Sequence, residues 1–192
     1  MRFARYQIEQ TEGLAIETGG AARGLMETDR GYPGDLDVLV RKGPPALDKA
    51  AKALGAGHPI DLARISRLPP LRAPEKVICV GLNYREHSAE SGFKQPDYPT
   101  LFSRFNSSLI GDGAERFNQR HGVRRRYAHC DYYSSEAITL RSGDVIVTGT
   151  TSGVGLSRKP LFMKAADTVE AEIERIGILA NPIVNATAEM SS

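Results

Sequence analysis

Apolar and polar residues alternate in short runs along the first 75 residues, with one exception. Pairs that contain glycine, Glu12-Gly13 and Gly19-Gly20, interrupt the early apolar positions, which indicates short strands joined by turns. Residues 44–56 instead carry apolar side chains at helical spacing, after a proline start and before a glycine stop, and they predict a short amphipathic helix. The four prolines within 57–75 exclude a long helix and predict an extended connector.

A second module follows this connector, and its apolar runs are shorter still. Residues 76–80 and 144–148 are apolar runs with glycine close behind them, which is typical of buried strands. Residues 83–90 contain helix-forming side chains and predict about two helical turns. The alternation over 168–184, interrupted by Gly177, predicts two antiparallel strands, so we expect a β-rich C-terminal half.

Length and composition fit this picture of a globular protein. The chain has 192 residues, 41% of them hydrophobic and 25% charged, which is enough for one domain with a small appendage. We expect a small N-terminal domain over 1–72 and a second domain over 73–192. The sequence has no apolar run of the roughly 18 residues that a membrane span needs, and residues 1–10 lack the apolar middle of a signal peptide, so we expect no membrane partner and a cytoplasmic protein. Cys79 and Cys130 are too few for a disulfide framework and are expected to be reduced.

Positive charge is concentrated in one segment of a chain whose net charge is only +2. Residues 114–133 contain five arginines against Glu115 and Asp131. Arg124–Arg126, next to Tyr127, have the side chains that bind phosphate and stack on bases. One cluster on a near-neutral chain is a weak electrostatic signal, so we expect a solvated loop and no nucleic-acid partner.

Two groups of residues have candidate chemistry. His87 and Glu90 lie three residues apart, so on a helix their side chains leave the same face and can hydrogen-bond. The imidazole can accept a proton near neutral pH, and the carboxylate would hold its tautomer, but ordinary exposed helices also carry such pairs. The glycine-rich run 149–155 can present backbone N–H groups and the Thr150 hydroxyl to a substrate oxygen, or it is an ordinary tight turn.

Three separated motifs decide between these interpretations: KVICVGLNYREHSAE, SEAITLRSGDVIVTGTTSGVG and FMKAADTVEAEIERIGILANPIV. Together they resemble the fumarylacetoacetate hydrolase family, and they occur in the family's order. The resemblance implies an α+β fold, a β-rich mixed-sheet roll with a small N-terminal α/β element, and a homodimer. It also implies metal-dependent hydrolysis, decarboxylation or isomerisation of a small oxo or diketo acid with Mg²⁺ or Mn²⁺. It places His87 and Glu90 on the catalytic dyad, and Thr150 on a residue that contacts the substrate.

The middle of the family's fold is missing from this sequence. Members are typically longer by roughly a hundred residues, and the junction at about 112–134 replaces the part where the resemblance implies two glutamates and an aspartate as metal ligands. A hard cation needs several such oxygen ligands. Asp112, Glu115 and Asp131 are the acidic residues of the junction, and none lies in a matching motif, so the metal ligands stay unassigned. The alternative function is therefore a catalytically impaired family remnant that lacks the metal site.

The basic segment itself suggests a genetic origin. One set of codons for Arg120 to Asp131, read one base later, encodes Gly-Met-Val-Phe-Asp-Val-Ala-Thr-Leu-Ile-Ala, which resembles the apolar helix that precedes the SEAITL motif in this family. Our hypothesis is a local frameshift beside an internal deletion. Burying the arginines would cost more free energy than leaving them in water, so we expect 114–133 to be an exposed connection.

Overall fold

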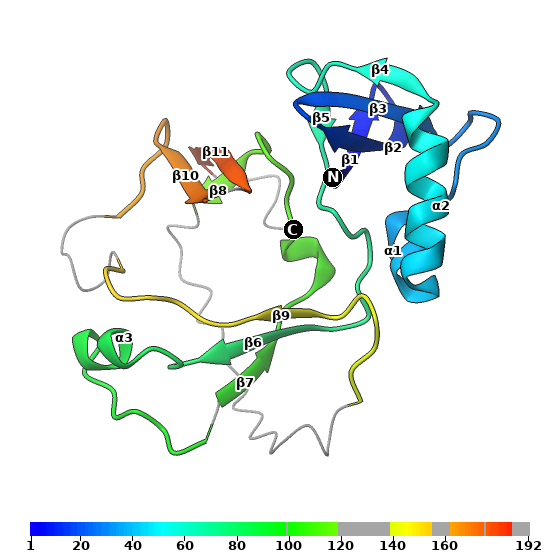
Figure 1. Ribbon diagram of the computed structural model, residues 1–192. Coiled ribbons are helices and arrows are strands. Elements are labelled where there is room, and N and C mark those ends of the chain that lie inside the picture. Colours follow the sequence, from blue (N-terminus) through cyan, green and yellow to red (C-terminus); the bar gives the residue numbers. More distant parts are fainter. Residues whose placement is uncertain (99, 119–138, 155–161, 175, 186–192) are drawn as a thin grey trace, which may run out of the picture. The chain divides into compact units, whose positions relative to one another are not determined.

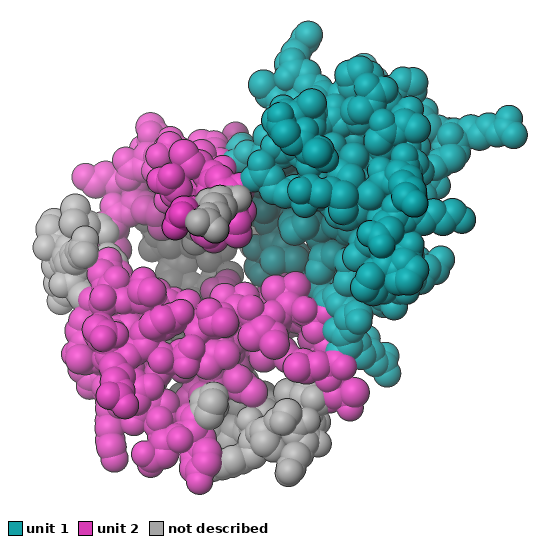
Figure 2. Space-filling model, in the orientation of Figure 1, with its two compact units in different colours: residues 1–75, 106–114, 141–143 teal, residues 76–105, 115–140, 144–192 magenta. Residues whose placement is uncertain are grey.

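The computed structural model describes most of the chain as two compact units, which Figure 2 shows in different colours. The first unit contains residues 1–75, 106–114 and 141–143, and the second contains 76–105, 115–140 and 144–192. The described residues are 1–98, 100–118, 139–154, 162–174 and 176–185.

The N-terminal unit is built on a five-stranded antiparallel sheet with the strand order β4-β3-β2-β1-β5 (Figure 1). The first three strands form two consecutive hairpins. The turn between the first two strands contains Glu9, which has a positive φ of 53°. Two much shorter strands extend the sheet at its edges. The strands are β1 (Arg2–Ile8), β2 (Thr11–Thr18), β3 (Ala21–Met26), β4 (His58–Ile60) and β5 (Ser66–Arg67).

Two helices, α1 (Leu36–Lys42) and α2 (Pro44–Gly55), complete this unit. Gly43, with a φ of 84°, separates them, and Pro44 begins the second helix, where its missing N–H costs nothing. The helices and the sheet bury one apolar cluster, which consists of Leu14, Ile16, Leu25, Leu36, Leu39, Ala50 and Leu54.

The C-terminal unit contains two three-stranded sheets, each with parallel and antiparallel pairs (Figure 1). In the first, β6 lies between β7, which is antiparallel to it, and β9, which is parallel. In the second, β11 pairs with β10 in antiparallel and with β8 in parallel fashion. The elements are β6 (Val77–Gly81), α3 (Arg85–Glu90), β7 (Thr100–Ser103), β8 (Arg116–Asn118), β9 (Val145–Val147), β10 (Thr168–Ile173) and β11 (Gly177–Asn185); a 3₁₀ turn, η1 (Asn106–Ser108), belongs to the first unit.

The structure confirms the α+β class and the mixed sheets, and most predicted elements are present. The pattern did not predict α1, β7 or β8, and the connector over 57–75 contains two short strands. The expected connection over 114–133 is wrong at its beginning, because residues 116–118 pair with β11; residues 119–133 lie outside the described part. Within the described ranges, no helix is long and apolar enough to cross a membrane.

Candidate active site

Strand β6 and the turn that follows it carry the first part of the candidate site. Val77 and Cys79 are buried, and Cys79 is a free thiol. The strand ends at Gly81, Leu82 takes a positive φ of 50°, and the chain then enters the short helix α3. The apolar run thus anchors a strand from which the helix projects its polar side chains.

His87 and Glu90 face each other on α3, as their spacing predicts. His87 Nδ1 lies 3.0 Å from Glu90 Oε1, and the two side chains are 18% and 20% exposed. The pair is therefore shielded on most sides but still open to a small molecule. Among the described residues, this is the one histidine with a carboxylate at hydrogen-bond distance.

The glycine-rich loop after β9 supplies further partners for Glu90. Gly153 N–H donates to Glu90 Oε2 at 2.8 Å, and Val154 N lies 3.5 Å from Oε1. The hydrogen bond with His87 and then that from Gly153 lower the pKa of Glu90 below its ordinary value. The carboxylate is consequently ionised at neutral pH, so it accepts hydrogen bonds and His87 Nδ1 donates one.

Parallel pairing explains why residues 63 positions apart meet here. Val77 pairs with Val145 and Cys79 with Val147, so both strands end at the same edge of the sheet. The α3 turn and the loop 148–154 leave from that edge. The contact of Glu90 with this loop therefore follows from the register of β6 and β9.

Thr150 lies in the same loop and is exposed. Asn83 Nδ2 donates to Thr148 O at 2.7 Å and fixes the loop at its base. Gly149 has a φ of 112°, and a Cβ there would lie 2.8 Å from Val80 O, so glycine is required for this close approach. The structure thus brings the loop that carries Thr150 to the His87–Glu90 helix. Sequence reasoning missed Asn83, although a side-chain amide two residues after a strand was an available signal.

The residues of the junction do not assemble a metal site in the described part of the chain. Asp112 Oδ2 lies 3.8 Å from Arg67 Nε within the N-terminal unit, whereas Glu115 belongs to the other unit. Asp131 lies outside the described residues, as does the cluster Arg124–Arg126. Among the residues that the structure describes, no group of three or more histidine, cysteine, aspartate or glutamate side chains could hold a metal ion.

Comparison with known sequences points to one family. Residues 130–184 match the family model for the C-terminal domain of fumarylacetoacetate hydrolase. The chain is 24% identical over 287 residues to the rat protein "Oxaloacetate tautomerase Fahd2a, mitochondrial", with 96% of this chain and 92% of the relative covered. It is 49% identical over 53 residues to the fumarylacetoacetate hydrolase domain-containing protein 2 homolog of Dictyostelium discoideum, which covers 27% of this chain and 17% of that protein.

Solved structures have the same fold. Maleylpyruvate hydrolase from Sphingobium sp. SYK-6, in complex with manganese (II) ion and pyruvate, matches with a TM-score of 0.67 at 16% identity. Fumarylacetoacetate hydrolase from psychrophilic Exiguobacterium antarcticum matches with a TM-score of 0.66 at 17% identity. Each comparison covers 97% of this chain and 100% of the other chain.

The rat alignment also shows a difference in length. It extends over 287 positions, whereas this chain has 192 residues, so roughly a hundred positions of the alignment have no residue of this chain opposite them. This agrees with the expected size of the missing part. The motifs, the family model over residues 130–184 and the fold point in one direction: the chain is similar to proteins of the fumarylacetoacetate hydrolase family.

Proposed function

We propose that this chain isomerises a small oxo acid by proton transfer, with His87 as the acid–base group and Glu90 as the residue that orients it. The observation that carries the proposal is the 3.0 Å contact between His87 and Glu90, with Glu90 also bonded to the loop of Thr150. The substrate class is supported by relatives whose names state oxaloacetate tautomerase and maleylpyruvate hydrolase. Of the reactions that the family resemblance implies, isomerisation requires the fewest catalytic groups.

The hydrogen bonds around Glu90 determine which ring nitrogen of His87 acts. Because Glu90 is ionised, Nδ1 keeps its proton and donates it to Oε1. Nε2 is then the nitrogen with an available lone pair in the neutral ring. When Nε2 gains a proton, the adjacent carboxylate stabilises the imidazolium that forms.

The reaction then needs one proton to leave and one to return. Nε2 of His87 accepts a proton from the carbon next to the keto group, and the electron pair moves onto the carbonyl oxygen to give an enolate. The protonated Nε2 then gives its proton to that oxygen, which yields the enol and restores the neutral ring. The reverse sequence restores the keto form, so atoms and electrons balance. The Thr150 hydroxyl is proposed to donate to a substrate oxygen. General acid–base catalysis of this kind contributes about 10²–10⁴-fold to a rate.

The cation that the resemblance implies, Mg²⁺ or Mn²⁺, has no matching set of ligands in the described part of the chain. A related structure contains manganese. Such a cation takes several oxygen ligands, and the described residues supply no group of three acidic, histidine or cysteine side chains for one. Because these residues do not fit the cation, no step of the proposed reaction passes through it.

A second candidate is a catalytically impaired remnant of the family. It is favoured by the roughly one hundred alignment positions without a counterpart in this chain, because the expected metal ligands belong to the missing part. The two candidates differ in whether His87 accelerates any reaction of an oxo acid.

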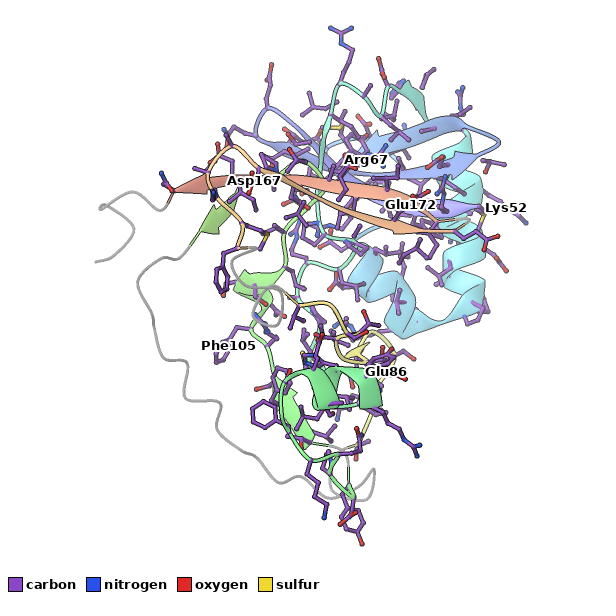
Figure 3. All side chains as sticks on the ribbon, turned by 90° about the vertical axis from the view of Figure 1, so that its left-hand side faces the viewer. Lys52, Arg67, Glu86, Phe105, Asp167 and Glu172 are labelled. Atoms are coloured by element: carbon purple, nitrogen blue, oxygen red, sulfur yellow. The ribbon has the colours of Figure 1, made fainter. Side chains whose placement is uncertain are left out.

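The test measures the conversion of enol oxaloacetate to the keto form, which is monitored as the loss of enol absorbance. We expect the wild-type chain to accelerate the conversion, and His87→Ala and Glu90→Gln to lower the rate by about 10² or more. Glu86→Gln is the matched control, because Glu86 lies on the same helix and is exposed (Figure 3). Equal rates for wild type and His87→Ala would support the remnant instead.

A further inference from the structure

The turn between β6 and α3 has a backbone conformation that a leucine rarely adopts. Leu82 has a φ of 50°, in the left-handed region where a Cβ is unfavourable. Three residues later the chain enters α3, whose His87 and Glu90 form the proposed site. Such a conformation persists only where the surrounding structure holds it.

Gln95 supplies that support from the loop after α3. Its Nε2 donates to Leu82 O at 2.7 Å, and its Oε1 accepts from Ser88 Oγ at 3.0 Å. Ser88 is 1% exposed, and its hydroxyl also lies 3.3 Å from Tyr84 O. One side-chain amide therefore connects the strained turn before the helix with a buried hydroxyl within the helix.

Ser88 lies directly after His87 in this short helix, so the network fixes the helix that carries the proposed pair. Phe93 N–H donates to Ser88 O at 2.9 Å, which returns the chain toward Gln95. With its start bound through Leu82 and its middle through Ser88, α3 has little freedom to rotate. Rotation of α3 would move Glu90 away from Gly153, which is 63 residues distant in sequence.

We propose that Gln95 is a positioning residue, which holds the left-handed turn at Leu82 and thereby keeps His87 and Glu90 aligned with the loop of Thr150. This inference rests on the proposed function, because it assigns Gln95 to the same site. It acts through the backbone of Leu82 and the hydroxyl of Ser88, and does not touch the substrate.

The chain contains a matched control for this arrangement. Gln7 Nε2 donates to Glu9 O at 2.9 Å, and Glu9 is another non-glycine residue with a positive φ, of 53°. This turn belongs to the N-terminal unit, whereas the proposed site belongs to the other unit. Gln7→Ala therefore removes the same kind of hydrogen bond without affecting α3.

The first measurement is a pH titration of the Glu90 side-chain carboxyl, which is monitored by NMR of the ¹³C-labelled full chain. In the wild type, the hydrogen bonds with His87 and Gly153 lower the pKa of Glu90. We expect Gln95→Ala and Gln95→Met to return it toward the ordinary value, and Gln7→Ala to leave it unchanged. Gln95→Met keeps a similar side-chain length, adds no charge and removes the amide donor, so it tests the contact with Leu82 if the alanine variant fails to fold.

A second-site variant separates positioning from general stability. Glycine adopts a positive φ without the Cβ penalty, so Leu82→Gly removes the need for Gln95 at the turn. We expect the double variant Leu82→Gly with Gln95→Ala to regain the lowered pKa of Glu90. We also expect Gln95→Ala to lower kcat for oxo-acid isomerisation by about 10-fold with a smaller change in KM, because misalignment affects the proton transfer.

The two readouts distinguish failure of this inference from failure of the proposed function. A wild-type chain without activity, but with a Glu90 titration that depends on Gln95, would reject the function and keep the positioning role. An unchanged Glu90 pKa in the folded Gln95→Ala and Gln95→Met variants would overturn the inference, whatever the activity. Failure of Leu82→Gly to restore the titration in a folded double variant would overturn it equally.

Discussion

Asp37 is the residue through which the first helix of the N-terminal unit holds the connector that follows, and its removal has a predictable cost. It is 6% exposed, and its two carboxylate oxygens accept hydrogen bonds of 2.9 Å from the backbone N–H groups of Arg72 and Ala73. Arg5, which is also buried, donates to Pro69 O in the same connector. Asp37→Ala leaves the two backbone donors without their acceptors.

The expected magnitude follows from these two donors. Arg72 and Ala73 are exposed residues, so water replaces part of each lost hydrogen bond, and each bond is worth about 0.5–1.5 kcal/mol. We therefore expect Asp37→Ala to reduce the free energy of unfolding of the N-terminal unit by about 1–3 kcal/mol. Asp37→Asn keeps one acceptor and should lose about half of that.

Urea unfolding measures this free energy for the unit itself when it is monitored by the NMR signals of residues 1–75. Asp48→Ala is the matched control, because Asp48 is an exposed aspartate on α2 and should change stability by less than about 0.5 kcal/mol. A loss below about 0.5 kcal/mol for Asp37→Ala would refute the reasoning, since it would mean that water satisfies both donors equally well.

The same carboxylate makes stability depend on pH. Burial alone would raise the pKa of Asp37, but the hydrogen bonds from Arg72 and Ala73 outweigh it and lower the pKa. A lowered pKa in the folded state means that the contribution is present above the unfolded value, near 3.8, and is lost as the pH falls through the folded value. Asp37→Ala should therefore show a weaker loss of stability in acid than the wild type.

Four further predictions concern packing, the basic segment and the cation. Tyr6→Phe should leave stability unchanged or raise it by about 1 kcal/mol in thermal unfolding, because the Tyr6 hydroxyl is buried with no partner among the described residues. Gly13→Ala should destabilise by about 2 kcal/mol or more in the same assay, since its Cβ would lie 2.5 Å from Tyr6 Cζ. Replacing Arg124, Arg125 and Arg126 with serine should change the unfolding free energy by less than about 0.5 kcal/mol, and a loss of several kcal/mol would show that the segment is packed. Millimolar Mn²⁺ should not raise the melting temperature, because a cation stabilises only a folded state that binds it; stoichiometric micromolar binding by calorimetry would contradict this.

Local patterns predicted the elements whose signals are short-range. The run over 76–80 and the proline and glycine at the ends of 44–56 indicate β6 and α2, which the structure contains. The sequence pattern did not predict helix α1. Its seven residues include two valines, which have a low helix propensity, and they make too few turns for helical spacing of apolar residues to be recognised. Strand β8 was missed because only its pairing with β11 makes it a strand.

The candidate site was predictable only where one helix carries it. The spacing of His87 and Glu90 predicts their contact, whereas the contact of Glu90 with Gly153 depends on the register of β6 and β9. Gln95 lies in a loop without periodicity, so nothing in its neighbourhood indicated its contact with Leu82.

Some expectations from the resemblance stay predictions. These are the catalytic roles of the site residues, the homodimer, the cytoplasmic location and the domain boundary at residues 72 and 73. The animal relatives are named as mitochondrial, so the compartment needs direct localisation. Sequencing genomic DNA across codons 108–136 tests the frameshift hypothesis.

The most direct test of the proposed proton transfer is deuterium incorporation into oxaloacetate in D₂O, at the carbon next to the keto group. The incorporation is monitored by ¹H NMR. If Nε2 of His87 removes and returns that proton, the wild-type chain accelerates exchange above the buffer rate, and His87→Ala loses about 10² or more of that acceleration. Glu86→Gln should exchange at the wild-type rate. Exchange by the wild-type chain at the buffer rate, or at the same rate as His87→Ala, would contradict the account.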